Sequence, residues 1–198
     1  MSITSFLIYC IVVTFTPGPT NIVILSTVHG FGVKKAMEYT YGATIAFGAL
    51  LTISAILNTI LVAVIPKILI TMQVFGSIYI LYLAYQVYHM NPTDMSANQV
   101  ATFHSGFIMQ FVNPKVVLFT MTVIPSFVMP YYTNPLMLAT FVAIITAVGF
   151  LAFLTWVLFG ALFKDIMLKH QKPVNISMSL FLIYSAIIGS GLVDNSWR

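Results

Sequence analysis

The chain has 198 residues, of which 60% are hydrophobic and only 6% are charged, and its mean hydropathy is +1.00. A soluble domain carries about 25% charged residues, so this composition excludes a water-facing surface and predicts an integral membrane protein. The net charge of +4 comes from basic residues that stand singly or in pairs at the ends of apolar segments. That distribution is typical of topology signals and argues against a nucleic-acid partner.

Six apolar segments follow one another along the chain, and we predict an all-α membrane protein with one transmembrane domain over residues 1–198. The six helices are expected at 3–28, 39–64, 68–90, 105–129, 135–163 and 174–193. Pro17-Gly18-Pro19 interrupts the first helix and Asn113-Pro114 the fourth. The second helix should end before Pro66-Lys67, and a short basic loop should precede the sixth.

Basic residues are unevenly divided between the two sides of the predicted bundle. The loops after the first and fifth helices share one side and carry Lys34, Lys35, Lys164, Lys169 and Lys172. The opposite side carries only Lys67 and Arg198. Because cytoplasmic loops are enriched in lysine and arginine, both termini are expected outside the cytoplasm.

The two interrupted helices occupy matching places in the two halves of the chain. Pro19 and Pro114 are 95 residues apart, and the same shift places the second helix on the fifth. Three helices per half would give the halves opposite orientations, so we expect two inverted three-helix repeats with broken helices 1 and 4, as in many secondary transporters. The half-repeats are residues 1–90 and 105–198.

The breaks carry the chemistry that the sequence predicts. Pro19 and Pro114 suit the first position of a new half-helix, with Gly18 and Asn113 as their caps. A half-helix that begins near the membrane midplane offers unpaired N–H groups and a positive dipole end, which attract carboxylates. The half-helix that ends there leaves free carbonyls, which attract ammonium groups, and an amino-acid zwitterion needs both. The alternative interpretation is a pair of ordinary proline kinks.

Lys115 is the only charged residue well inside a predicted span. A lysine at the midplane costs about 2.5–3.5 kcal/mol on insertion scales, so it should face a cavity or a partner. It would either contact a carboxylate and control transport, or pack with its amine held by carbonyls freed at the break. Gln110 lies one turn before Pro114 and could face the same cavity. The candidate substrate-binding residues are Thr16, Gly18, Pro19, Thr20, Asn21, Gln110, Asn113, Pro114 and Lys115.

Four stretches carry a family signature: Thr16 to Asn21, Gln110 to Lys115, Gly76 to Ala84 and Asn175 to Ala186. In these stretches the chain resembles the LysE/RhtB family of amino-acid exporters, and the resemblance covers nearly the whole chain. It implies a six-helix secondary exporter in a bacterial cytoplasmic (inner) membrane, driven by the proton gradient. Ala46 departs from the glycine that many members have in the second helix, which bears on packing and not on class.

The expected function is export of a small neutral amino acid or derivative, of the cysteine/O-acetylserine or the homoserine/threonine type. Every carboxylate lies at or beyond a span end: Glu38, Asp94, Asp165 and Asp194. A basic amino acid or a divalent metal would prefer a buried carboxylate, so we expect neither as substrate, no metal site and no cofactor. The expected partners are the amino acid, protons as coupling ion and the lipid bilayer, and an oligomer is left open.

Two other classes are weighed against an exporter. The chain has no HExxH or Gly-x-Ser-x-Gly motif and no buried acid–base pair, so we predict that it is not an enzyme. The alternative is a passive channel or facilitator for small polar solutes. Channels usually line the pore with repeated polar or charged rings, and these spans are too apolar for that.

Overall fold

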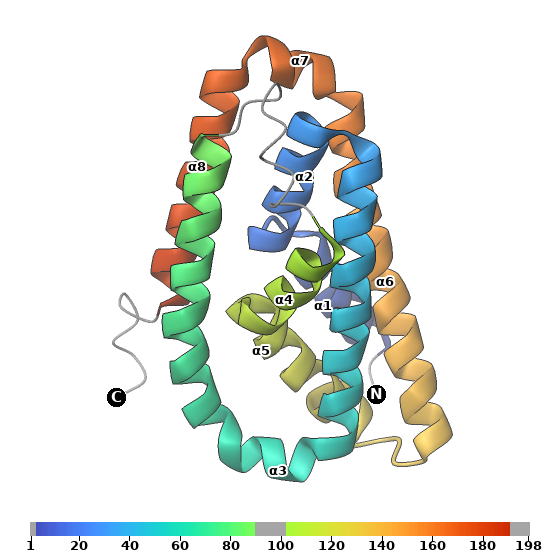
Figure 1. Ribbon diagram of the computed structural model, residues 1–198. Coiled ribbons are helices and arrows are strands. Elements are labelled where there is room, and N and C mark those ends of the chain that lie inside the picture. Colours follow the sequence, from blue (N-terminus) through green and yellow to red (C-terminus); the bar gives the residue numbers. More distant parts are fainter. Residues whose placement is uncertain (1–2, 90–101, 191–198) are drawn as a thin grey trace.

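The computed structural model describes residues 3–89 and 102–190, without the side chains of 58–73 and 189. Within these ranges all of the regular secondary structure is helical (Figure 1). The elements are α1 (Ile3–Phe15), α2 (Pro19–Phe31), α3 (Val33–Tyr88), α4 (Phe103–Val112), α5 (Pro114–Val123), the π-helix η2 (Ile124–Val128), α6 (Pro135–Leu162), α7 (Lys164–Lys169) and α8 (Gln171–Gly189). The described part therefore confirms the all-α prediction.

Both predicted breaks are present. The axes of α1 and α2 differ by 46°, and the axis of α4 differs by 68° from that of the segment Pro114–Val128. Gly18 in extended conformation precedes Pro19 at the start of α2, and Asn113 precedes Pro114 at the start of α5. Proline suits the first helical position because its missing N–H has no partner there in any case.

The prediction of two helices here holds, but the predicted separation at Pro66-Lys67 was wrong. α3 spans Val33 to Tyr88 and joins two helices across a kink at Leu57, the one residue with non-helical dihedral angles, φ −101° and ψ 16°. In Figure 1 the helix descends, turns and rises again on the other side of the molecule. A proline inside a helix loses one hydrogen bond, whereas an open loop exposes several backbone groups, so a kinked continuous helix is the less costly way to reverse direction near lipid.

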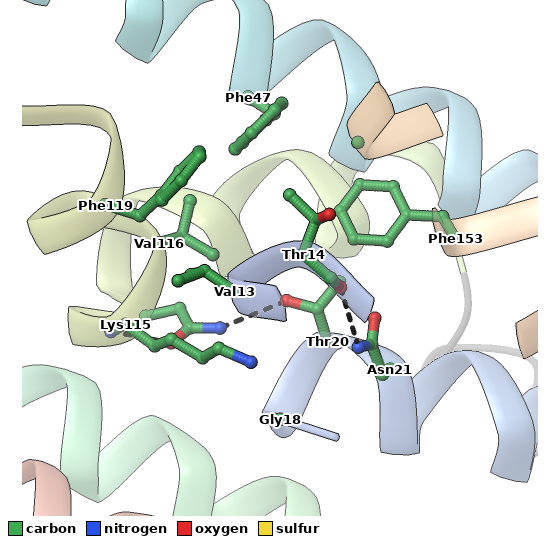
Figure 2. Close-up of a pocket in the computed structure, with 12 residues that line it drawn as sticks. Val13, Thr14, Gly18, Thr20, Asn21, Phe47, Lys115, Val116, Phe119 and Phe153 are labelled. Carbon is green, nitrogen blue, oxygen red and sulfur yellow. Dashed lines mark hydrogen bonds between the residues drawn. The ribbon is translucent and has the colours of Figure 1, made fainter. Parts of the chain in front are cut away.

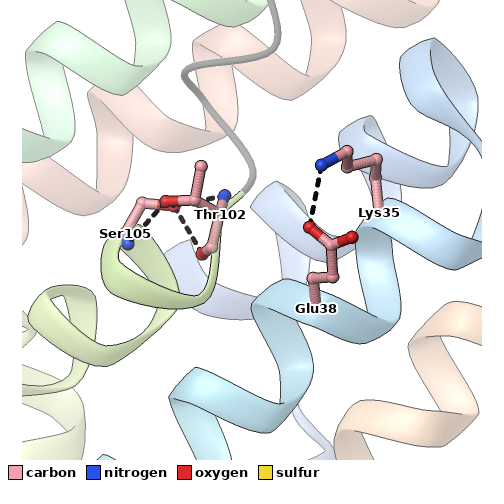
Figure 3. Close-up of polar contacts among 4 residues, drawn as sticks. All are labelled: Lys35, Glu38, Thr102 and Ser105. Atoms are coloured by element: carbon pink, nitrogen blue, oxygen red, sulfur yellow. Dashed lines mark hydrogen bonds and ion pairs between the residues drawn. The ribbon is translucent and has the colours of Figure 1, made fainter.

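Some helix bounds and one loop also differ from the sequence prediction. α3 begins at Val33 and not at 39, and the expected basic loop contains the short helix α7. α4 begins at Phe103 because Thr102 forms a capping box: its Oγ1 accepts from the Ser105 amide at 3.1 Å, and Ser105 Oγ accepts from the Thr102 amide at 2.9 Å (Figure 3). Each such cap satisfies backbone donors that the helix cannot pair. The predicted end of the last helix, at 193, lies outside the described residues.

Two helices are long and apolar enough to cross a membrane alone, Val33–Leu57 and Pro135–Leu162. The number rises to four if each bent pair counts as one span, and Val74–Tyr88 is a shorter apolar helix. These figures concern only the described residues. Large apolar side chains lie on the outside, such as Leu136 and Leu162 on α6, which are 75% and 81% exposed. An apolar exterior is what a bilayer requires.

Two apolar clusters fill the interior and lie on either side of the first break. One gathers side chains of α2, the two arms of α3, α6 and α8 around Val23, Leu83 and Leu182. The other gathers side chains of α1, α3, α5 and η2 around Phe6 and Phe119. Polar side chains are buried where the clusters meet the breaks, and they form the candidate site.

Candidate binding site at the two helix breaks

A cavity opens where the two broken helices face each other across the bundle. The space between the lining atoms is about 390 Å³, and this figure includes volume that is open to the outside. Figure 2 shows the residues that line it. They are Val13, Thr14, Gly18, Thr20, Asn21, Phe47, Asn113, Lys115, Val116, Phe119, Gly149 and Phe153.

The carbonyls freed at the first break have side-chain donors as partners. Asn21 Nδ2 donates to the Thr16 carbonyl at 2.9 Å and to the Thr14 carbonyl at 3.4 Å. Trp156 of α6 donates from Nε1 to the Phe15 carbonyl at 3.3 Å. Proline prevents the chain from supplying backbone N–H groups here, and in an apolar surrounding each unpaired carbonyl would be costly. These side chains therefore hold the break in its bent form.

Lys115 reaches from the second break to the first. Its Nζ donates to the Thr16 carbonyl at 2.9 Å, to Thr16 Oγ1 at 3.0 Å and to the Pro17 carbonyl at 3.4 Å. Figure 2 shows the side chain extended from α5 toward Gly18. The amine is thus held by carbonyls freed at a break, as one sequence interpretation proposed, but the carbonyls belong to the other broken helix.

Thr20 joins the two breaks from the α2 side. Its Oγ1 accepts hydrogen bonds from Gln110 Nε2 at 3.2 Å and from Asn113 Nδ2 at 3.1 Å. All three side chains are at most 3% exposed. Asn113 also caps α5, because its Oδ1 accepts from the Lys115 amide at 3.1 Å. One asparagine therefore fixes both the start of α5 and the distance between the two broken helices.

Two buried acceptors at this junction have no protein partner among the described residues: Asn21 Oδ1 and Gln110 Oε1. Asn21 lines the cavity, and it is 3% exposed. In addition, no side chain caps the N-terminus of α2. A buried acceptor without a partner costs about 1–3 kcal/mol, so a ligand that donates a hydrogen bond to Asn21 Oδ1 would recover that cost.

The structure brings the sequence-predicted residues together at one place. Five of them line the cavity: Gly18, Thr20, Asn21, Asn113 and Lys115. Thr16 holds the Lys115 amine, Gln110 holds Thr20, and Pro19 and Pro114 begin α2 and α5. Their role in binding a substrate stays a prediction.

The sequence analysis missed the walls of the cavity. Phe47, Phe119 and Phe153 line it from three different helices, and Thr14 lines it from α1. The analysis also missed Trp156 of α6, which does not line the cavity but donates to the Phe15 carbonyl at the break. Nothing in their local pattern separates them from ordinary core residues, because apolar residues at helical spacing are the rule in every span. Only Trp156 offered a signal, since a buried indole N–H usually requires an acceptor.

Charge near the cavity is one-sided. Lys115 lines it, and no carboxylate does among the residues that the structure describes. Glu38 pairs with Lys35 at 2.8 Å on the partly exposed start of α3 (Figure 3), and Asp165 lies on α7. Asp94 and Asp194 lie outside the described residues. Likewise, no three potential metal-ligating side chains gather within the described ranges.

In its described part the protein is all-helical, with an apolar exterior and two broken helices that meet at one cavity. This is the architecture of a membrane transport protein. Residues 11–189 match the family described as LysE type translocator. The chain belongs to this family. It is therefore a multi-pass membrane translocator and not an enzyme, in agreement with the sequence prediction.

Three bacterial relatives illustrate the similarity, and each bears the name cysteine/O-acetylserine efflux protein. The protein from Klebsiella pneumoniae is 31% identical over 93% of this chain and 95% of its own length. The protein from Salmonella typhimurium is 29% identical over 94% and 96%, and that from Escherichia coli K12 is 28% identical over 93% and 95%. No solved structure matches the chain. Bacterial relatives and membrane-spanning helices together support a place in the inner membrane.

Proposed function

We propose that this protein exports a small neutral amino acid or derivative, of the cysteine/O-acetylserine or homoserine/threonine type, and uses the proton gradient to do so. The observation that carries the proposal is the cavity between the breaks. It holds a cationic side chain, an unpaired acceptor and an uncapped helix N-terminus, and no carboxylate lines it among the described residues. The similarity to efflux proteins named for cysteine and O-acetylserine supports the same class of substrate.

The polar groups of the cavity suit a zwitterion. The Lys115 ammonium and the uncapped start of α2 favour a carboxylate. Asn21 Oδ1 and the carbonyls of the first break favour an amino group. The apolar walls at Phe47, Phe119 and Phe153 leave the third substituent a small, uncharged environment. A basic side chain would face Lys115 without a carboxylate to balance it.

Reciprocal contacts between α3 and α8 support the proposed arrangement of six spans in two inverted repeats, 1–90 and 105–198. Ser77 Oγ donates to the Ala186 carbonyl and Ser179 Oγ donates to the Ala84 carbonyl, each at 3.0 Å. The two serines are as far apart in sequence as the two alanines, so a two-fold axis between the helices would exchange one bond for the other. Transport would then follow from rocking one repeat against the other around the cavity.

The predicted orientation, with both termini outside the cytoplasm, is also part of the proposal. A Cβ placed on Gly32 would lie 3.9 Å from Lys164 Nζ, so the basic segments after α2 and α6 lie at the same end of the molecule, as the charge count requires. Cys10 is the single cysteine. In a Cys10→Ala background, a cysteine at position 169 should react with an impermeant thiol reagent only from the cytoplasmic side, and one at position 134 only from the opposite side. The reverse labelling would reject the orientation.

Transport into reconstituted vesicles tests the function directly. The panel is labelled cysteine, O-acetylserine, threonine, homoserine, leucine and lysine, each measured with and without an imposed pH gradient, and protein-free vesicles serve as the control. We expect gradient-dependent accumulation of one or more of the neutral amino acids and none of lysine. Equilibration that ignores the gradient would favour the passive facilitator, and absence of any movement would reject the exporter.

A further inference from the structure

We propose that Lys115 is a built-in substitute for the amino group of the substrate. In the substrate-free protein the Lys115 ammonium donates hydrogen bonds to the carbonyl oxygens at the first break. When a substrate binds, the substrate's ammonium group takes over these hydrogen bonds and Lys115 moves away. This inference rests on the proposed function, because it assigns a step to the same cavity. The alternative is that Lys115 keeps these hydrogen bonds at all times and simply links the two broken helices.

The first argument is that the amine is fully paired at this place. An ammonium group has three N–H donors, and Lys115 Nζ has three acceptors: the Thr16 carbonyl, Thr16 Oγ1 and the Pro17 carbonyl. The two carbonyls follow α1, which ends at Phe15, and they lie in the break between α1 and α2. They would receive an ammonium group of any origin equally well, because their geometry is set by the break and not by the lysine.

The second argument is that the side chain lies across the start of α2. A Cβ built on Gly18 would lie 3.2 Å from both Cδ and Nζ of Lys115, so the lysine side chain passes close to this glycine. No side chain caps that helix end. In this position Lys115 therefore covers both the carbonyls that suit an amino group and the helix N-terminus that suits a carboxylate.

The third argument is that Lys115 leaves part of the ammonium site unused. Asn21 Nδ2 lies 2.9 Å from the Thr16 carbonyl that Lys115 contacts, yet Asn21 Oδ1 has no partner. An ammonium group on a freely placed ligand can reach Asn21 Oδ1 as well as the carbonyls, whereas the lysine is tethered to α5. With its three donors, a ligand ammonium would pair the two carbonyls and the buried Asn21 Oδ1, which the lysine leaves unpaired, in place of the bond to Thr16 Oγ1.

The exchange also keeps every charge partnered. When the amino group of a zwitterion displaces Lys115, its carboxylate can pair with the freed ammonium, which avoids an isolated charge in an apolar surrounding. A simple amine has no carboxylate to offer. The wild-type protein should therefore reject amines of the right size and accept the corresponding amino acids.

A binding experiment with n-propylammonium tests this idea, because that ion has the length of the lysine side chain beyond Cβ. Purified wild type, Lys115→Ala and the control Lys169→Ala, which truncates an exposed lysine on α7, are placed in lipid nanodiscs. Thermal unfolding is followed at increasing concentrations of n-propylammonium, with n-propanol as the uncharged probe. If Lys115 fills its site about nine-tenths of the time, the probe should bind the Lys115→Ala variant about tenfold more tightly than wild type.

We expect a saturable rise in the unfolding midpoint of Lys115→Ala with n-propylammonium, no rise with n-propanol, and equally weak responses of wild type and Lys169→Ala. Equal responses of all three proteins, or none in Lys115→Ala, would overturn the proposal. Should Lys115→Ala not fold, Lys115→Ser gives the same decision. If the wild type transports amino acids but the Lys115 variants do not bind n-propylammonium, the substitution by Lys115 is rejected and the proposed function stands. If the Lys115 variants bind n-propylammonium but the wild type transports no amino acid, the proposed function is rejected.

Discussion

Thr20 and Asn113 belong to different broken helices, and a hydrogen bond of 3.1 Å joins their side chains inside the bundle. The same Thr20 oxygen accepts a second bond from Gln110 at 3.2 Å. Two amide groups of the second break thus donate hydrogen bonds to one hydroxyl of the first. A movement of either break must therefore change these two hydrogen bonds. In the proposed transport by rocking repeats, this contact would couple the two repeats.

Replacement of that hydroxyl should separate the two breaks. Thr20→Val keeps the shape of the side chain but leaves the buried Asn113 amide without an acceptor, at about 1–3 kcal/mol. The Gln110 amide would keep only its bond to the Gly106 carbonyl, at 3.3 Å. We expect a lower unfolding midpoint and a transport rate reduced about tenfold or more, since about 1.4 kcal/mol corresponds to a factor of ten. Thr155→Val is the control, because the exposed Thr155 hydroxyl bonds only to Leu151 of its own helix. Equal effects of both variants would contradict a special role for Thr20.

The cap of α5 should matter for transport beyond its effect on stability. Asn113→Ala removes an N-cap, which costs about 1 kcal/mol, and also removes the bond to Thr20. The chain offers a matched control in Asn134, which precedes Pro135 and caps α6 in the same way, with Oδ1 2.9 Å from the Leu136 amide, but lies exposed. Both variants should insert into the membrane, and Asn113→Ala should lose more stability because it also loses the buried bond to Thr20. Only Asn113→Ala should lose transport in the vesicle assay. Normal transport by Asn113→Ala would remove Asn113 from the site.

Loss of the charge in the cavity should reduce transport without preventing membrane insertion. Lys115→Ala removes the ammonium proposed to receive the substrate carboxylate, whereas Lys169→Ala removes an exposed charge far from the breaks along the chain. Transport rate per inserted molecule is the quantity to compare. We expect a decrease of about tenfold or more for Lys115→Ala, as for loss of a hydrogen bond to a charged group. A wild-type rate in Lys115→Ala would show that Lys115 has no part in binding.

A close approach of two backbones behind the second break should not tolerate a methyl group. A Cβ built on Gly76 would lie 2.1 Å from the Val112 carbonyl, which is backbone and has no side-chain freedom to move away. Gly76→Ala should therefore destabilise the protein by about 1–3 kcal/mol or more through overpacking. Gly48→Ala is the comparison, because its nearest neighbours, at 3.2 Å and 3.3 Å, are side-chain atoms of Thr146. Unfolding midpoints that fall equally would show that the backbone contact is not limiting.

Much of this architecture could be predicted from the sequence because its signals are local. Proline and glycine act on the residues next to them, so the breaks at Pro19 and Pro114 could be placed correctly. The turn in α3 could not, because a proline permits a break but does not force one. The sequence favoured Pro66, whereas the dihedral angles depart from helical values at Leu57.

The candidate site shows the same division. Its residues were predicted from composition, because Lys115 is a charge in an apolar span and Asn113 stands before a proline. Their partners were not predicted: the Lys115 amine crosses to Thr16, and Thr20 receives both Gln110 and Asn113.

The sequence by itself thus determined that the chain lies in a membrane, where its helices break and which polar residues the breaks contain. Each of these follows from the transfer of side chains into lipid and from the geometry of single residues. Only the tertiary structure decided that the two breaks share one cavity, that phenylalanines from three helices wall it, and that a lysine of one break satisfies the carbonyls of the other. These are contacts between residues about a hundred positions apart, and no local pattern encodes which distant donor an unpaired carbonyl will find.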